Sequence, residues 1–161
     1  MTSLIEFTSE LQGLVRLSLK SFAHKCQGKD RCTNPTCIYQ GVQRHKDPQP
    51  NPYLDMCYTS TMTLFKLMQT YLPISSDELV HRVQVFRKDG PTGRKNSKGP
   101  IKHFWLELDD HVFDPSYPQY VIGKTALPTY DGGELRKFHK EPIRRPQMVL
   151  PLLNHCLSSL N

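Results

Sequence analysis

Three residues whose side chains together perform thiol chemistry occur in the order Cys57, His103 and Asp114. In such a set a thiolate attacks an acyl carbon, an imidazole moves the proton, and a carboxylate orients the imidazole. The reaction predicted is attack on an amide, isopeptide or thioester carbonyl through an acyl-enzyme, which water or an amine then resolves. The three side chains must meet for this to happen, so the elements that carry them have to bring them together.

His103 and Asp114 belong to the stretch IKHFWLELDDHVFDPS, which is typical of two short antiparallel strands. If residues 109 and 110 form a two-residue turn, the alternation of side chains places His103 and Asp114 on one face. They are then diagonal neighbours within reach of a side-chain hydrogen bond. A three-residue turn would put them on opposite faces, so the predicted pair depends on this register.

Cys57 opens the stretch CYTSTMTLFKLMQTYL, whose apolar residues form one helical stripe, and we expect a central buried helix with Asp55 as its N-cap. A helix N-terminus stabilises a thiolate through its positive dipole end and its free N–H groups. The backbone N–H of Cys57 and an amide side chain would hold the oxyanion. Asn51, Gln49 and Gln43 are the upstream candidates for that amide, and the sequence does not choose among them.

Each residue of this set also has an ordinary structural explanation. A cysteine at a helix start is often a small buried apolar group. A histidine in a strand is commonly structural or exposed, and an aspartate before proline commonly caps the turn that ends a strand. The order of helix-start cysteine, strand histidine and next-strand aspartate favours the catalytic interpretation.

A cysteine at the start of a central helix, followed by HFWLEL and FDPS, resembles the papain-like and transglutaminase-like cysteine enzymes. More narrowly, MCYTSTMTLFKLM with KHFWLELDDHVFDPSYPQY and a later tyrosine-glycine turn is similar to small uncharacterised phage and bacterial proteins reading CY…HW…DPT…QF. The similarity covers residues 55–150 approximately. The resemblance implies Cys57 as nucleophile, His103 as base and then acid, and Asp114 as orienting group, with Gln119 as a substrate or structural contact.

The chain departs from that pattern in three places, which concern the substrate more than the triad. Phe104 precedes Trp105, a basic insertion precedes the hairpin, and the amino-terminal segment is rich in cysteine. Trp105 is predicted to lie in the core. The alternative is that it walls the acyl site and contacts substrate, because it follows the histidine by two residues.

Residues 24–52 lose hydrophobic periodicity and hold three cysteines, two histidines and four prolines, so we expect an irregular segment. Its cysteines are separated by five and four residues, as in CCCH-type zinc fingers, but the histidine expected four residues after the last cysteine is Gly41. The candidate zinc ligands are Cys26, Cys32 and Cys37, with His45 or His24 as the fourth. A structural zinc would order this segment. The alternative is a surface loop with reduced cysteines.

The remaining elements follow from local patterns. Residues 3–20 are predicted to form an amphipathic helix, and ELVHRVQVFRK a strand in which Val83 and Val85 face inward. DGPTGRKNSKGP is predicted to be a loop, and the chain is turn-rich from Asp114 to residue 133. A terminal helix should begin or bend at Pro151.

The predicted fold is one α+β domain spanning residues 1–161, papain-like or transglutaminase-like, with the central helix packed on a small antiparallel sheet. Only 37% of residues are hydrophobic, and no apolar run approaches the roughly 20 residues of a membrane span. We expect no membrane partner. The amino terminus lacks the pattern of a secretory signal, which favours the cytoplasm, or the host cytoplasm if the protein is viral. There the five cysteines are expected to be reduced.

The net charge of +6 favours acidic substrates or polyanions. We expect a protein or peptide-like substrate and no cofactor requirement for catalysis. The basic run over residues 87–102 is predicted to be a solvated loop or, since it leads to His103, a lid or guide for an acidic substrate. The alternative function is a non-enzymatic, zinc-stabilised protein that binds nucleic acid or another partner.

Overall fold

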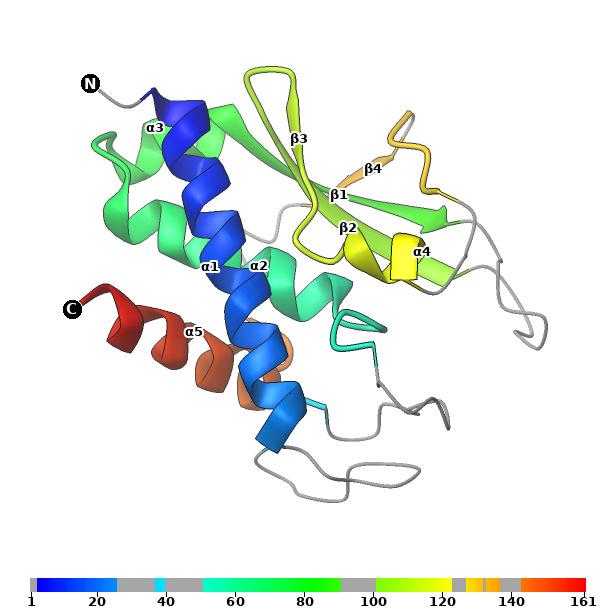
Figure 1. The fold of residues 1–161 in the computed structure, drawn as a ribbon. Helices are drawn as coiled ribbons and strands as arrows, with labels where there is room; N and C mark the ends of the chain where they lie inside the picture. Colours follow the sequence, from blue (N-terminus) through cyan, green and yellow to red (C-terminus); the bar gives the residue numbers. More distant parts are fainter. Residues whose placement is uncertain are drawn as a thin grey trace.

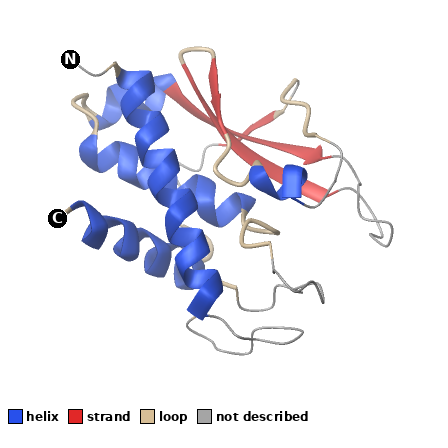
Figure 2. Cartoon of the chain, in the orientation of Figure 1, coloured by secondary structure: helices blue, strands red, loops and turns tan. Residues whose placement is uncertain are grey.

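A computed structural model describes residues 3–25, 37–39, 51–90, 101–122, 127–131, 133–136 and 143–161. In chain order the elements are α1 (Leu4–Lys25), α2 (Cys57–Tyr71), α3 (Ser76–Arg82), β1 (Val83–Gly90), β2 (Ile101–Leu108), β3 (His111–Phe113), α4 (Pro118–Ile122), β4 (Glu134–Arg136) and α5 (Pro146–Leu160). The long helices gather on one side of the molecule and the strands on the other (Figures 1 and 2). The predicted α+β class, with a central helix against a small antiparallel sheet, is confirmed.

The sheet has the strand order β3-β2-β1-β4, and every neighbouring pair is antiparallel. Asp109 and Asp110 form the turn between β2 and β3 with φ values of 47° and 64°. Two positive φ values are what a two-residue type I′ turn requires, and aspartate tolerates them better than most residues. Leu108 therefore pairs with His111, as the two-residue turn requires, and the predicted register is confirmed.

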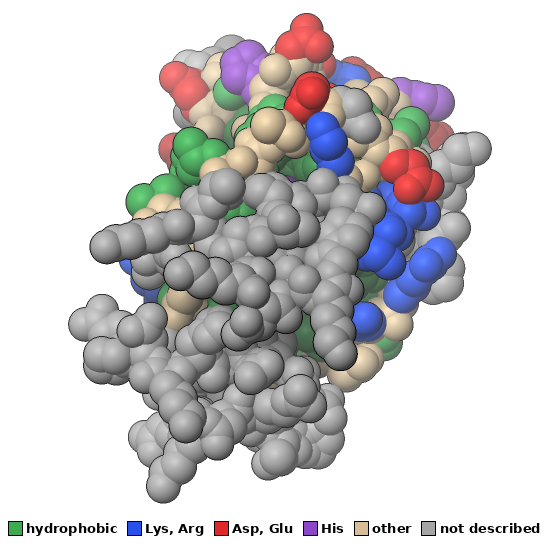
Figure 3. All heavy atoms as spheres, turned by 90° about the vertical axis from the view of Figure 1, so that its right-hand side faces the viewer, with side chains coloured by type: hydrophobic (Ala, Val, Ile, Leu, Met, Phe, Trp, Pro, Cys, Tyr) green, Lys and Arg blue, Asp and Glu red, His purple; other side chains and the backbone are tan. Residues whose placement is uncertain are grey.

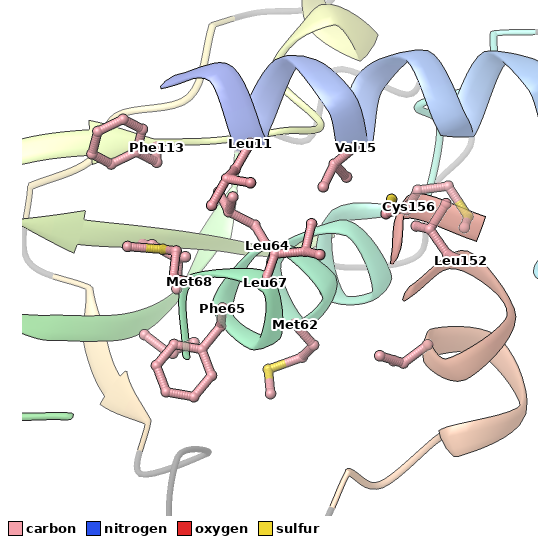
Figure 4. Packing of buried hydrophobic residues seen from close by; sticks show 14 of the residues in the cluster. Leu11, Val15, Met62, Leu64, Phe65, Leu67, Met68, Phe113, Leu152 and Cys156 are labelled. Atoms are coloured by element: carbon pink, nitrogen blue, oxygen red, sulfur yellow. The ribbon is translucent and has the colours of Figure 1, made fainter. Parts of the chain in front are cut away.

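The apolar side of α2 forms the centre of the hydrophobic core. Leu64 and Leu67 are fully buried and lie between Leu11 of α1 and Leu152 of α5 (Figure 4). Both of these helices pack on α2, and the cluster continues to Phe113 of the sheet. Removal of this apolar surface from water is what holds α2 between the helices and the strands.

The other side of α2 meets the backbone of β2 through polar side chains. β3 pairs only with residues 106–108 of β2, so it stops short of the part of β2 that precedes Leu106. There the Thr61 hydroxyl donates to the carbonyl of Phe104 (3.1 Å) and the Cys57 thiol to that of Lys102 (3.5 Å). Because Cys57 and Thr61 are four residues apart, they lie on one face of the helix. These two hydrogen bonds to β2 place the first residue of α2 beside the strand segment that carries His103.

Several predicted boundaries are wrong. The strand expected over ELVHRVQVFRK begins only at Val83, because the residues before it end helix α3. Ser75 caps that helix by accepting from the N–H of Glu78 (3.2 Å), and the buried Leu79 anchors it. α1 continues to Lys25, beyond the predicted end.

The carboxy-terminal helix begins at Pro146, not at Pro151, which lies inside it. Proline suits the first helical turn, and the apolar face of α5 continues past the second proline, so packing outweighs the lost N–H. Helix α4 lies in the region predicted only as turns, and strand β4 follows that region, where no element was predicted. β1 includes residues 89 and 90, which were predicted to belong to the loop at 89–100, and residues 91–100 lie outside the described part. None of the helices in the described ranges is long and apolar enough to cross a membrane.

Candidate active site

Cys57 is the first residue of α2 and is 9% exposed. The residue before it, Met56, is the N-cap and makes no side-chain cap hydrogen bond, so the predicted Asp55 cap is wrong. The Met56 N–H donates a hydrogen bond to the Tyr53 carbonyl (3.2 Å), so the turn before α2 ends one residue later than expected. Asp55 lies in this turn with a φ of 61°. The N-cap side chain is therefore uncharged, and it adds no negative charge at the helix N-terminus, where a thiolate would be stabilised.

His103 and Asp114 form the predicted pair. Nε2 of His103 lies 2.7 Å from Oδ2 of Asp114, and the two residues are 2% and 4% exposed. Asp114 directly follows β3, so the short strand and its type I′ turn set the position of the carboxylate against β2. A buried imidazole in contact with a buried carboxylate has a fixed ring orientation.

The carboxylate of Asp114 accepts four hydrogen bonds. Oδ2 accepts from His103 and from the hydroxyl of Tyr130 (2.8 Å), and Oδ1 accepts from the N–H (3.0 Å) and the hydroxyl (2.9 Å) of Ser116. Four donors match the four lone-pair positions of an ionised carboxylate. Burial and the charge of Asp114 raise the pKa of Tyr130, which keeps its hydroxyl protonated as a donor.

The turn that carries Asp114 is fixed from two sides. Arg16 of α1 donates from Nη2 to the Asp114 carbonyl (2.8 Å) and from Nε to the Pro115 carbonyl (3.2 Å). Gln119 donates to the hydroxyl of Ser116 (3.2 Å), which in turn donates to Asp114. Gln119, implied by the resemblance as a substrate or structural contact, thus lies in the hydrogen-bond chain that ends on His103.

The electrostatics of the site favour a charged imidazole. Burial alone lowers the pKa of His103, but the hydrogen bond to Asp114, then the hydrogen bond to Cys57, and the charges of both partners raise the pKa to about 9. The thiol of Cys57 is thus close enough to the ring to shift the pKa of the imidazole.

Trp105 forms an aromatic wall beside the histidine. It is fully buried, and its ring centre lies 6.1 Å from that of His103 with an interplanar angle of 22°. Phe86 stacks on it at 5.6 Å, and Tyr130 meets it edge-on at 5.4 Å. The predicted core position of Trp105 is confirmed by its burial, and a role in contacting substrate stays a prediction.

Gly133 is required beside this wall. A Cβ atom at residue 133 would lie 2.4 Å from Cη2 of Trp105 and 3.2 Å from Cβ of Phe86. Only glycine lets the backbone approach the indole this closely.

Searches of protein-family models, curated proteins and solved structures find no match to this chain. Its function is therefore inferred from the geometry of the site.

The remaining predicted site residues are only partly described. The side-chain oxygen of Asn51 accepts from the Tyr53 N–H (3.0 Å), and its amide donates to the Gln119 carbonyl (3.3 Å), so Asn51 ties the loop before α2 to α4. An oxyanion role for it stays a prediction. Gln49 and Gln43 lie outside the described residues.

The zinc prediction also falls mainly on undescribed residues. Cys26, Cys32, His45 and the side chain of His24 are outside the described part of the chain. Cys37 is described and half-buried, and lies two residues before the buried Tyr39, whose hydroxyl lies 2.7 Å from the Leu19 carbonyl. Within the described ranges, no three His, Cys, Asp or Glu side chains are grouped to hold a metal.

Four residues of the site were not predicted from the sequence, namely Arg16, Ser116, Tyr120 and Tyr130. The hydroxyl of Tyr120 lies 2.9 Å from Nδ1 of His103. Ser116 had a local signal, since a serine two residues after an aspartate often closes an Asx turn. Arg16, Tyr120 and Tyr130 reach the site from other elements. Tyr120 and Tyr130 stand in the quoted PQY and in the tyrosine-glycine turn, but no role was predicted for them.

Proposed function

We propose that this protein is a thiol-dependent hydrolase or acyl transferase of papain-like or transglutaminase-like type, with Cys57 as nucleophile, His103 as base and acid, and Asp114 as orienting group. The observation that supports the proposal is a buried imidazole held at 2.7 Å by a carboxylate, beside a thiol at a helix start whose presence raises the pKa of that imidazole. Each group alone has an ordinary structural role, whereas their contact is what acyl transfer requires.

In the proposed reaction the Cys57 thiolate forms a bond to the carbonyl carbon of an amide, isopeptide or thioester. The carbonyl electron pair moves to oxygen, and the backbone N–H of Cys57 would donate to that oxyanion. When the tetrahedral intermediate collapses, the bond to the leaving group breaks and His103 gives it a proton. Neutral His103 then takes a proton from water or an amine, which attacks the thioester and frees Cys57.

The proposed substrate is a protein or peptide-like molecule, with acidic character favoured by the net charge of +6. Lys102, which is exposed, directly precedes His103 on β2. On the face shown in Figure 3, Lys and Arg side chains gather along one edge. Positive charge on this surface would raise the local concentration of an acidic substrate.

Acyl-enzyme formation tests the proposal without knowledge of the natural substrate. p-Nitrophenyl acetate should acetylate Cys57, with release of p-nitrophenolate, and mass spectrometry of peptides should locate the acetyl group. Cys57→Ala and His103→Ala should each abolish the initial burst of p-nitrophenolate. Cys156→Ala removes a buried thiol that is hydrogen-bonded to Ser18 (3.3 Å), and this variant should retain the burst. Equal labelling of the wild type and the His103→Ala variant would refute the proposal.

A further inference from the structure

The imidazole of His103 has a third polar neighbour. The hydroxyl of Tyr120 lies 2.9 Å from Nδ1, and the two rings meet edge to face with centres 5.2 Å apart. Since Nε2 is held by Asp114, Nδ1 is the nitrogen left to exchange a proton with Cys57. Tyr120 is only 7% exposed, so this contact is shielded from water. The tyrosine therefore touches the ring atom that would carry the reacting proton.

The fold holds Tyr120 against the reacting groups. Its backbone N–H donates to the Tyr117 carbonyl (3.0 Å), which continues the turn after Asp114 into α4. The amide of Asn51 donates to the Gln119 carbonyl (3.3 Å) and so joins α4 to the loop that leads into Cys57. The tyrosine and the carboxylate are thus set by one stretch of backbone, which the Asn51 side chain joins to the loop before the thiol.

A hydroxyl is suited to a nitrogen that gains and loses a proton. The Nδ1 atom is a donor in the imidazolium and an acceptor in the neutral ring when Nε2 carries the proton. A carboxylate could only accept and an ammonium could only donate, whereas a hydroxyl rotates to do either. Because a buried polar atom left without a partner is costly, a partner that serves both states lowers the penalty of the proton transfers.

We propose that Tyr120 is a positioning residue that keeps His103 Nδ1 hydrogen-bonded in both protonation states, and so holds the ring in the orientation that serves Cys57. The inference rests on the proposed function of this site. When the thiol S–H bond breaks, the hydroxyl releases the Nδ1 lone pair, a bond between Nδ1 and hydrogen forms there, and the new N–H is shared between the Cys57 thiolate and the hydroxyl, which now accepts. When Nδ1 gives this proton to the leaving group, its lone pair is restored and the hydroxyl donates to it again, and Tyr120 itself neither gains nor loses a proton.

The other titratable groups around the ring cannot take this role. Asp114 holds Nε2, and Tyr130 donates to Asp114. Lys88 of β1 lies opposite His103 in the sheet, but its ammonium pairs with the carboxylate of Asp131 (3.2 Å). Among these neighbours, the hydroxyl of Tyr120 lies against Nδ1 and can be deleted without a change in charge.

The test is the alkylation rate of Cys57 by iodoacetamide across about pH 5 to 10, read from its peptide by mass spectrometry. Tyr120→Phe should slow alkylation near neutral pH by about tenfold, because the charged ring loses an acceptor, and should move the pH profile toward that of an ordinary thiol. Tyr117→Phe, on the same turn with its ring centre 6.5 Å from that of Tyr120, is the matched control and should leave the profile unchanged. Thermal unfolding of each variant reports whether the fold is retained.

The outcomes separate this inference from the proposed function. If wild-type Cys57 reacts no faster than an ordinary thiol and His103→Ala leaves the alkylation rate unchanged, the proposed function as a thiol enzyme is refuted. If His103→Ala slows the reaction but Tyr120→Phe matches the wild type or reacts faster, only the role of Tyr120 is overturned. Should Tyr120→Phe fail to fold, nuclear magnetic resonance of the wild type decides: the Nδ1–H proton of His103 should exchange slowly with water, and rapid exchange would overturn the inference.

Discussion

The two sides of α2 are both buried but are held by different interactions. On one side Leu64 and Leu67 pack among the apolar residues of α1 and α5. On the other, Cys57 and Thr61 donate to carbonyls of β2, and the adjoining network reaches the buried His103. Apolar packing depends on area and volume, whereas each buried polar group depends on a particular partner. The core should therefore govern stability, and the polar side should govern reactivity.

The largest effect is expected from Asp114→Asn. An amide has the shape of the carboxylate, but its NH₂ group cannot accept from the donors that surround Asp114, and the orientation and tautomer of His103 are lost. We expect the rate of Cys57 acylation by p-nitrophenyl acetate to fall by about 10³-fold or more. Asp110→Asn, in the exposed turn, is the matched control. A rate for Asp114→Asn within a few-fold of the wild type would show that the polar side of α2 does not govern reactivity.

Leu67→Ala tests the opposite side of the helix. Removal of a fully buried leucine side chain leaves a cavity, and the free energy of unfolding should fall by about 2–5 kcal/mol in urea titration. The alkylation profile of Cys57 in the folded protein should keep its shape, since no polar contact is lost. A changed profile would mean that the two sides are not independent.

The dependence of stability on pH should come largely from the polar side. The pKa of His103 is raised from 6.5 to about 9 in the folded protein. Its contribution is therefore complete below about pH 6.5 and is lost as the pH rises through about 9, with a total on the order of 3 kcal/mol. Urea unfolding at several pH values measures it, and His103→Gln should flatten the dependence over this window. An equal dependence in His103→Gln would assign it to other groups.

Gly133→Ala should have the smallest of these effects. The added methyl group would press on Trp105, and the strain should cost about 1–3 kcal/mol in the free energy of unfolding. Because Trp105 stacks beside His103, acylation should also slow by a few-fold. Gly13→Ala, where an added Cβ meets nothing within 4 Å, is the control and should not destabilise the protein. Equal stability of the two variants would show that the indole can shift freely.

What the sequence could predict was local. The turn at Asp109 and Asp110 and the alternation of the strands fix which residues share a face, so the contact of His103 with Asp114 followed from spacing. The start of α2 at Cys57 followed from its apolar stripe. Both features depend on residues close together in the chain.

The contacts that complete the site join distant segments. Arg16 is 98 residues from the carbonyl that it binds, and Tyr120 is 17 residues from His103. Tyr120 lies on α4, a helix too short for a periodic pattern. The position of Met56 at the helix cap depends on a turn that the sequence does not mark, so the expected Asp55 cap was wrong.

The most direct test of the central claim, that His103 is shared by Asp114 and Cys57, is the titration of its ring followed by nuclear magnetic resonance in the wild type and in Cys57→Ala. The account predicts a pKa near the value of about 9 in the wild type and a lower one once the sulfur is removed, because the contact with Cys57 raises the pKa. A ring that titrates at or below 6.5 and is unaffected by Cys57→Ala would contradict it.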